Sequence, residues 1–143
     1  MFAKRIAWID FNGNKREQTF YFGLDETDLT NYQMSHNGGM TEMLQSMIDA
    51  QDNANLAKKF EELILMCYGE KSDDGMYFMK SPEISHKFRC TGAYNALFLE
   101  FLKGGEQYTA DFINAVIPED LAKQLAAEKG VEGPTLVVDK ADN

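Results

Sequence analysis

Apolar residues recur at helical spacing through most of this chain, and that periodicity restricts its fold more than any other feature. One stripe falls on relative positions 0, 3, 4, 7 and 8, a single helical face, and comprises Met40, Met43, Leu44, Met47 and Ile48. Comparable stripes occupy 56–67, 84–90, 94–102 and 108–117. Gly69 and Gly104-Gly105 follow two of these stripes and are natural helix ends.

Residues typical of helix starts stand before several of the stripes. Asp25 can cap a short helix that runs to about Ser35, and Ser81-Pro82 combines an N-cap residue with a proline at the first helical position. Pro118 restarts a helix that is predicted over 121–129. Together, the stripes and the caps predict five to seven helices.

Residues 4–24 predict a β-hairpin, because two β-prone runs flank Asn12-Gly13, the strongest short hairpin signal. A two-residue turn at Asn12-Gly13 would place Asp10 opposite Lys15, an attractive pair. A four-residue loop would place Asp10 opposite Glu17, a repulsive pair. We therefore predict the two-residue turn.

These elements predict a mainly α fold of the α+β class. At 143 residues the chain fits one domain of ordinary size. We expect a single globular domain over 1–130, with the hairpin at 4–24 and the helices at 25–130. Residues 131–143, which include Gly133-Pro134, are predicted to form a flexible C-terminal tail.

The composition restricts partners and compartment. A net charge of −9 and the lack of a basic patch disfavour nucleic-acid binding. No apolar run approaches the ~18 residues of a membrane span. The first 20 residues lack the continuous apolar core that is typical of a signal peptide. Cys67 and Cys90 lie within helical stripes and are predicted to be buried thiols, which suits a reducing compartment. These features indicate a cytosolic protein.

The segment 68–82 links two predicted helices and combines charge with aromatic residues. Ser72 to Gly75 has the composition of a tight turn. Tyr77 and Phe78 follow directly, and this part is too apolar for a plain linker. These two side chains must either pack on the core or offer a surface to another molecule.

The sequence contains no complete catalytic or metal site. His86 and Cys90 are four residues apart and could act as base and nucleophile, but no third group is identifiable. The same pair with Cys67 could bind zinc, although known zinc spacings need two close ligand pairs. Asp73-Asp74-Gly75 lacks the other ligands of a calcium loop. We predict no enzymatic activity and no cofactor.

Methionines are concentrated in the middle third of the chain. Met40, Met43 and Met47 share one helical face, which by default is core. Because methionine side chains are polarizable and adaptable, the same face could instead form a groove for a helical partner.

Several stretches resemble the tail assembly chaperones of long-tailed bacteriophages and prophages. The similarity spans roughly residues 4 to 125 and is carried by YGEKSDDGMYFMKSPEIS from Tyr68, by Ala93-Tyr94 with Phe98-Leu99-Glu100, and by the run from Ala110 to Pro118. The hairpin ending in Phe20-Tyr21-Phe22 is similar too.

This resemblance implies a non-enzymatic assembly role in the host cytoplasm. Such chaperones coat the tape measure protein, keep it soluble and help to recruit the tail tube protein, and many are made in two lengths, of which this chain would be the shorter. A homo-oligomer could supply apolar grooves repetitively to a long helical client. The candidate protein-binding residues are Met40, Met43, Met47, Tyr77, Phe78, Trp8 and Tyr21. A structural tail component that stays in the virion is the alternative.

Overall fold

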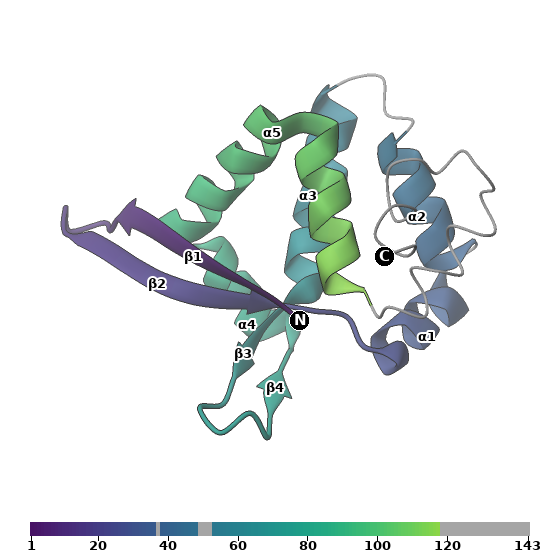
Figure 1. The fold of residues 1–143 in the computed structure, drawn as a ribbon, viewed down its shortest axis with the longest axis horizontal. Helices are drawn as coiled ribbons and strands as arrows, with labels where there is room; N and C mark the ends of the chain where they lie inside the picture. Colours follow the sequence, from purple (N-terminus) through teal and green to yellow (C-terminus); the bar gives the residue numbers. More distant parts are fainter. Residues whose placement is uncertain (37, 49–52, 118–143) are drawn as a thin grey trace, which may run out of the picture.

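The computed structural model describes residues 1–36, 38–48 and 53–117. In chain order its elements are β1 (Phe2–Ile9), β2 (Lys15–Phe22), α1 (Glu26–Ser35), α2 (Gly39–Ile48), α3 (Asn53–Cys67), β3 (Tyr68–Lys71), β4 (Phe78–Met79), α4 (Pro82–Arg89) and α5 (Gly92–Val116). Helix α3 lies near the middle of the molecule and contacts α2, α4 and α5 (Figure 1). The mainly α fold with an N-terminal β-hairpin is therefore confirmed.

The four strands form one antiparallel sheet in the order β1-β2-β3-β4. Phe2 lies opposite Phe22, and Phe22 in turn lies opposite Tyr68. Along β1, burial alternates as the pleat requires, so that Ile6 is buried while its neighbours are exposed. Helix α5 packs against β1, and α4 packs against β3. One face of the sheet therefore meets the helices.

The loop between β1 and β2 corrects the predicted two-residue turn. Ile9 pairs with Lys15, and the backbone N–H of Asp10 donates to the carbonyl of Asn14 at 2.8 Å. The loop consequently comprises Phe11 to Gly13, and Asp10 stands opposite Asn14 rather than opposite Lys15. Gly13 has φ 85°, a left-handed conformation that glycine adopts without steric cost and that a three-residue hairpin loop requires.

Hydrogen bonds within the loop explain why cross-strand charge did not set this register. One carboxylate oxygen of Asp10 accepts the backbone N–H groups of Asn12 and Asn14 at 2.9 and 2.8 Å. The other oxygen accepts from Nε of Arg16 at 2.6 Å. These bonds also lower the pKa of Asp10, with the Arg16 bond as the largest cause. Asp10 thus stabilises its own loop instead of pairing with Lys15.

A second hairpin, β3–β4, was not predicted from the sequence. It follows α3 without a break, and Glu70 lies opposite Met79 while Lys71 lies opposite Phe78. The predicted tight turn within it is confirmed by a 3.0 Å bond from the N–H of Gly75 to the carbonyl of Ser72. This hairpin extends the sheet beyond the N-terminal pair and projects from the helical body (Figure 1).

Most predicted helix boundaries are confirmed. Asp25 and Asp28 form a capping box at the start of α1, and Ser81 caps α4 with Pro82 in its first turn. The predicted break at Gly104-Gly105 is a kink inside α5, where Gly105 has φ 64° and ψ −150°. The helix expected over 121–129 and the tail expected over 131–143 lie outside the described residues.

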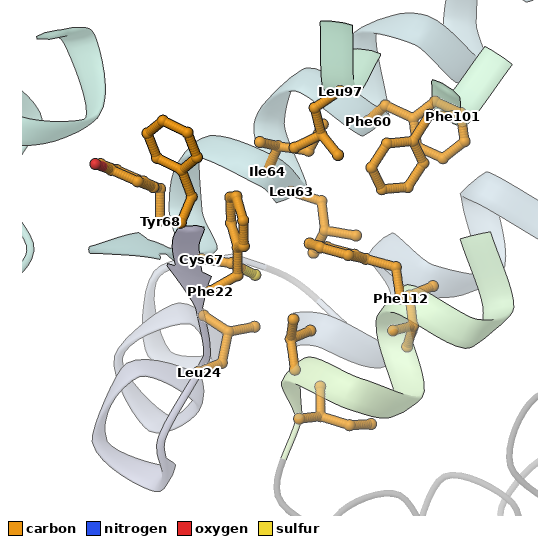
Figure 2. Close-up of a cluster of buried hydrophobic side chains, with 14 of the residues drawn as sticks. Phe22, Leu24, Phe60, Leu63, Ile64, Cys67, Tyr68, Leu97, Phe101 and Phe112 are labelled. Atoms are coloured by element: carbon orange, nitrogen blue, oxygen red, sulfur yellow. The ribbon is translucent and has the colours of Figure 1, made fainter. Parts of the chain in front are cut away.

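The core is dominated by aromatic side chains from every layer of the fold. Phe22 is completely buried, and its ring centroid lies 5.7 Å from that of Tyr68 and 5.8 Å from those of Phe88 and Phe112. Figure 2 shows Phe22 from β2, Cys67 at the end of α3 and Phe112 from α5 meeting in this cluster. Edge-to-face and tilted ring pairs of this kind add to the stabilisation from apolar burial.

The two cysteines differ in burial. Cys67 is completely buried, as predicted, and burial raises the pKa of its thiol. Cys90 is exposed, so the prediction that it faces the core is wrong. The reason is that α4 ends at Arg89 and Cys90 caps it, which turns the chain toward α5 before the apolar stripe of α4 can continue.

Replacing Phe22 with alanine should lower the free energy of unfolding by about 3–5 kcal/mol, because the ring is completely buried and its removal leaves a cavity. Phe11→Ala is the matched control, since Phe11 is 86% exposed and should change stability by less than about 0.5 kcal/mol. Urea denaturation measures both values. Equal effects of the two substitutions would contradict this core.

Candidate protein-binding surfaces

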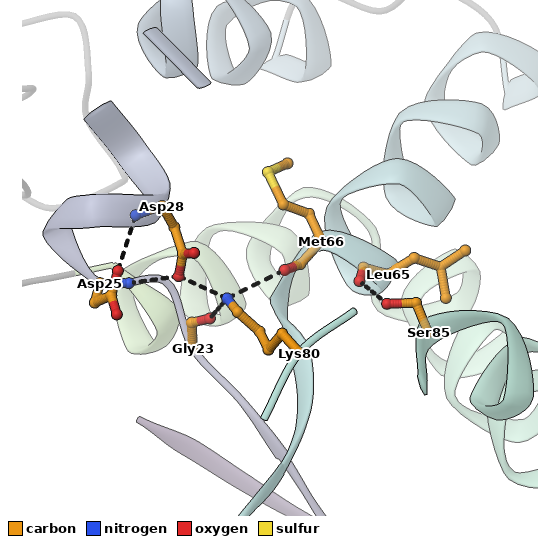
Figure 3. Close-up of polar contacts among 7 residues, drawn as sticks. All are labelled: Gly23, Asp25, Asp28, Leu65, Met66, Lys80 and Ser85. Carbon is orange, nitrogen blue, oxygen red and sulfur yellow. Dashed lines mark hydrogen bonds and ion pairs between the residues drawn. The ribbon is translucent and has the colours of Figure 1, made fainter. Parts of the chain in front are cut away.

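The base of the β3–β4 hairpin is fixed by Lys80, the first residue after β4. Its ammonium group donates to the carboxylate of Asp28 at 2.7 Å, to the carbonyl of Gly23 at 2.9 Å and to the carbonyl of Met66 at 3.3 Å. Figure 3 shows these acceptors converging on the Lys80 nitrogen from three separate segments. The side chains of Lys80 and Asp28 are only 18% and 29% exposed, so solvent screens their ion pair incompletely.

Asp28 takes part in two networks at once. Partial burial acts to raise its pKa, but hydrogen bonds from Lys80 and from the backbone N–H of Asp25, with the charge of Lys80, outweigh burial and lower the pKa. The same carboxylate therefore caps helix α1 and holds the cation that anchors the hairpin. Nearby, Ser85 of α4 donates to the carbonyl of Leu65 at 2.8 Å, which ties α4 to α3 (Figure 3).

The tip of the hairpin is fixed by its own polar side chains. Ser72 Oγ donates to the carboxylate of Asp74 at 2.8 Å and accepts the backbone N–H of Tyr77 at 2.9 Å. Asp74 also accepts the backbone N–H of Met76 at 3.0 Å, and these bonds lower the pKa of its carboxyl. The turn is consequently ordered although Asp73, Asp74 and Gly75 are exposed.

Large apolar side chains cover this ordered tip without packing on the core. Met76, Tyr77 and Met79 are 71%, 62% and 55% exposed. Phe78 behaves differently, because its ring lies over Gly69, where an added Cβ would come within 2.7 Å of the ring. The question that the sequence left open therefore has two answers: Phe78 packs on the sheet, whereas Tyr77 faces solvent.

The other predicted residues of the sheet lie on opposite faces. Tyr21 is half-buried on the face away from the helices, where Lys71 Nζ lies 5.1 Å from its ring centroid. Trp8 is half-buried on the helical face, 5.6 Å from the ring of Phe20. Trp8 also lines a shallow, mainly apolar pocket of about 370 Å³, together with Phe11, Arg16 and Cys90. The sheet thus separates these two aromatic residues instead of bringing them together.

Two of the three predicted methionines are part of the core. Met43 and Met47 are 3% and 4% exposed on α2. The side chain of Met40 lies outside the part of the chain that the structure describes. Met43 and Met47 therefore occupy the core position that helical spacing favours by default, and their binding to another protein stays a prediction.

His86 and Cys90 meet as their spacing suggested, with 3.6 Å between Cys90 Sγ and His86 Nε2. Within the described ranges, no group of three or more histidine, cysteine or acidic side chains could hold a metal ion. Cys67, the third residue once considered for zinc, is buried in the core and is not brought to this exposed pair.

Comparison with models of known protein families gives a match over nearly the whole sequence. The family described as phage tail assembly chaperone matches residues 1–142 of the sequence. The chain belongs to this family. No curated protein and no solved structure gives a match. Across the described residues of this tail assembly chaperone, no helix has both the length and the apolar character to cross a membrane.

The sequence did not identify Met76 and Met79 as parts of an exposed surface of this tail assembly chaperone, nor Lys80 as the residue that anchors the hairpin. Strand β4 spans only Phe78–Met79, which is too short to show strand periodicity. The one usable signal was the turn composition of Ser72 to Gly75 between two β-prone ends, which could have indicated a hairpin.

Asp28→Asn and Lys80→Met, alone and together, should show a coupling of about 1 kcal/mol in the free energy of unfolding at neutral pH. The pKa of Asp28 is lower in the folded chain than the usual value of about 3.9. Its stabilisation is therefore complete above that value and is lost as the pH falls through the folded pKa. Urea denaturation should show the coupling beginning to decline below about pH 4. A coupling that stays constant into acid would contradict this ion pair.

Proposed function

We propose that this tail assembly chaperone binds the tape measure protein, keeps it soluble and assists assembly of the tail tube. It does so through contact alone, without enzymatic activity and without a cofactor. The observation that carries the proposal is the ordered apolar tip of the β3–β4 hairpin, which presents Met76, Tyr77 and Met79 to solvent. The family supports an assembly role in general, and the exposed tip supplies a surface for a client.

An ordered tip binds an apolar client more favourably than a loose one. Hydrogen bonds of Ser72 and Asp74 fix the turn, and Lys80 fixes its base, so little backbone entropy is lost on binding. Burying one large apolar side chain contributes about 1.5–3 kcal/mol. Methionine adapts its shape to different contacts, which suits a client that presents many non-identical apolar stripes.

We further propose that several copies act together in the host cytoplasm. A long client needs repeated contacts, and linked copies raise the effective concentration of each binding surface. The N-terminal hairpin, with Trp8 and Tyr21, is our candidate for the contact between copies. The tail tube protein would be a second partner.

A structural tail component that remains in the particle is the alternative function. Both roles use exposed apolar surfaces, so the described surface is compatible with either. Mass spectrometry of purified virions separates them, because a chaperone should be absent from the particle and a structural component should be present at a fixed stoichiometry.

Co-expression with the candidate tape measure protein tests the proposed function. We expect the wild-type chain to move most of the client into the soluble fraction. The double substitution Met76→Ser with Tyr77→Ser should abolish much of this effect, because it removes the two most exposed apolar side chains of the tip and leaves the net charge unchanged. The soluble fraction of the client, measured by quantitative gel analysis, is the readout.

Met34→Ser is the matched control, since Met34 is 80% exposed on α1, away from the hairpin. It should leave client solubility unchanged. All variants should unfold within about 0.5 kcal/mol of wild type, because the replaced side chains are exposed. A client that stays insoluble with the wild-type chain would refute the proposed function.

A further inference from the structure

We propose that the β3–β4 tip selects an amphipathic segment whose apolar stripe is flanked by lysine or arginine. This inference rests on the proposed function and adds the chemistry of the client segment to it. The binding surface comprises Glu70, Asp73, Asp74, Met76, Tyr77 and Met79. It combines an apolar patch with carboxylates that lie within the same short hairpin.

The register of the hairpin places charge beside the apolar residues. Glu70 lies directly opposite Met79, so their side chains are neighbours on one face of the ribbon, and both are exposed. Asp73 and Asp74 precede Met76 with only Gly75 between them, and both are exposed as well. A partner that contacts Met76 or Met79 therefore also approaches an acidic residue of the same hairpin.

The two cations of this described segment form no ion pair with those carboxylates, although the charge of Lys71 contributes slightly to lowering the pKa of Asp74. Lys71 donates to the carbonyl of Ser72 at 3.0 Å and lies over the ring of Tyr21, on the other face of the ribbon from Glu70. Lys80 is held at the base by Asp28 and two backbone carbonyls. Among the ion pairs of the described residues, none involves Glu70, Asp73 or Asp74.

Asp74 keeps its charge although it serves the turn. Its hydrogen-bond partners favour the ionised carboxylate and lower its pKa, so the negative charge persists in mildly acidic solution. An acidic partner would meet repulsion from this site and from the net charge of −9, whereas a basic partner would be attracted by both. Charge complementarity therefore selects a cationic amphipathic segment.

Two designed helical peptides of about 18 residues test the inference. Both carry leucine at the same i, i+3, i+4 and i+7 positions, but one has lysine and the other has glutamate at the flanking positions. Fluorescence anisotropy should show the lysine peptide binding at least about tenfold more tightly at ~50 mM NaCl. This preference should shrink at ~500 mM NaCl, because salt screens exposed charges.

Variants of the chain distinguish binding of the peptide at the tip from non-specific electrostatic attraction to the whole acidic protein. Met76→Ser with Tyr77→Ser keeps every charge and should weaken binding of the lysine peptide about tenfold. Glu70→Gln with Asp73→Asn keeps the apolar side chains and should reduce the preference for lysine to about threefold or less. Met34→Ser should bind both peptides as the wild-type chain does.

Equal affinity for the two peptides, or no measurable binding of either, would overturn the inference. Unchanged binding by the Met76→Ser, Tyr77→Ser variant would overturn it too, because the attraction would then be diffuse. The proposed function has its own readout: a wild-type chain that solubilises the tape measure protein without any charge preference refutes only the inference. A chain that selects the lysine peptide but does not solubilise that client refutes the function.

Discussion

The ammonium group of Lys80 joins segments that lie far apart in the sequence. It links the end of the β3–β4 hairpin to Gly23 after β2, to Asp28 in α1 and to Met66 near the end of α3. A half-buried cation is costly unless each of its donors finds an acceptor, and here all three do. Lys80 therefore helps to fix the position of the exposed hairpin relative to the helical body, together with the pairing of β3 with β2, and its partner Asp28 also takes part in the cap of α1.

The aromatic cluster around Phe22 supplies the stability that this arrangement needs. Rings from β1, β2, α4 and α5 meet there, so loss of packing in any layer weakens the others. The cluster also orients the sheet, because Phe2 and Phe22 contact Phe112 of α5 from two neighbouring strands. The core thus anchors the sheet to the helices, and the sheet leaves the apolar tip of β3–β4 in solvent.

Much of the helical architecture could be predicted from the sequence because it depends on local signals. Each of these signals depends only on residues within one or two helical turns. Examples are the cap at Asp25, the helix start at Ser81-Pro82 and the break near Gly105. The register of the first hairpin could not be predicted from opposing charges, because the Asp10 carboxylate bonds to backbone N–H groups of its own loop. Strand pairing of β3 with β2 is a long-range contact that no local pattern reports.

The candidate site was only partly predictable for the same reason. Tyr77 could be named from its unusual place in a charged segment, and the structure shows that its side chain is exposed. Helical spacing placed Met43 and Met47 on one face, but it could not decide whether that face is covered, because covering depends on how α2 meets α3. Met76 and Met79 could not be named because their exposure results from the β3–β4 hairpin, which was not predicted.

The contrast between the two cysteines has a practical consequence. Cys67 is sealed inside the core, whereas Cys90 is open to solvent at the junction of α4 and α5, beside the pocket that Trp8 lines. A thiol-directed fluorophore or crosslinker should consequently attach to one defined position in the native chain, without any engineered cysteine. Because this position adjoins the tip of the first hairpin, such a label would report directly on whatever approaches that end of the sheet.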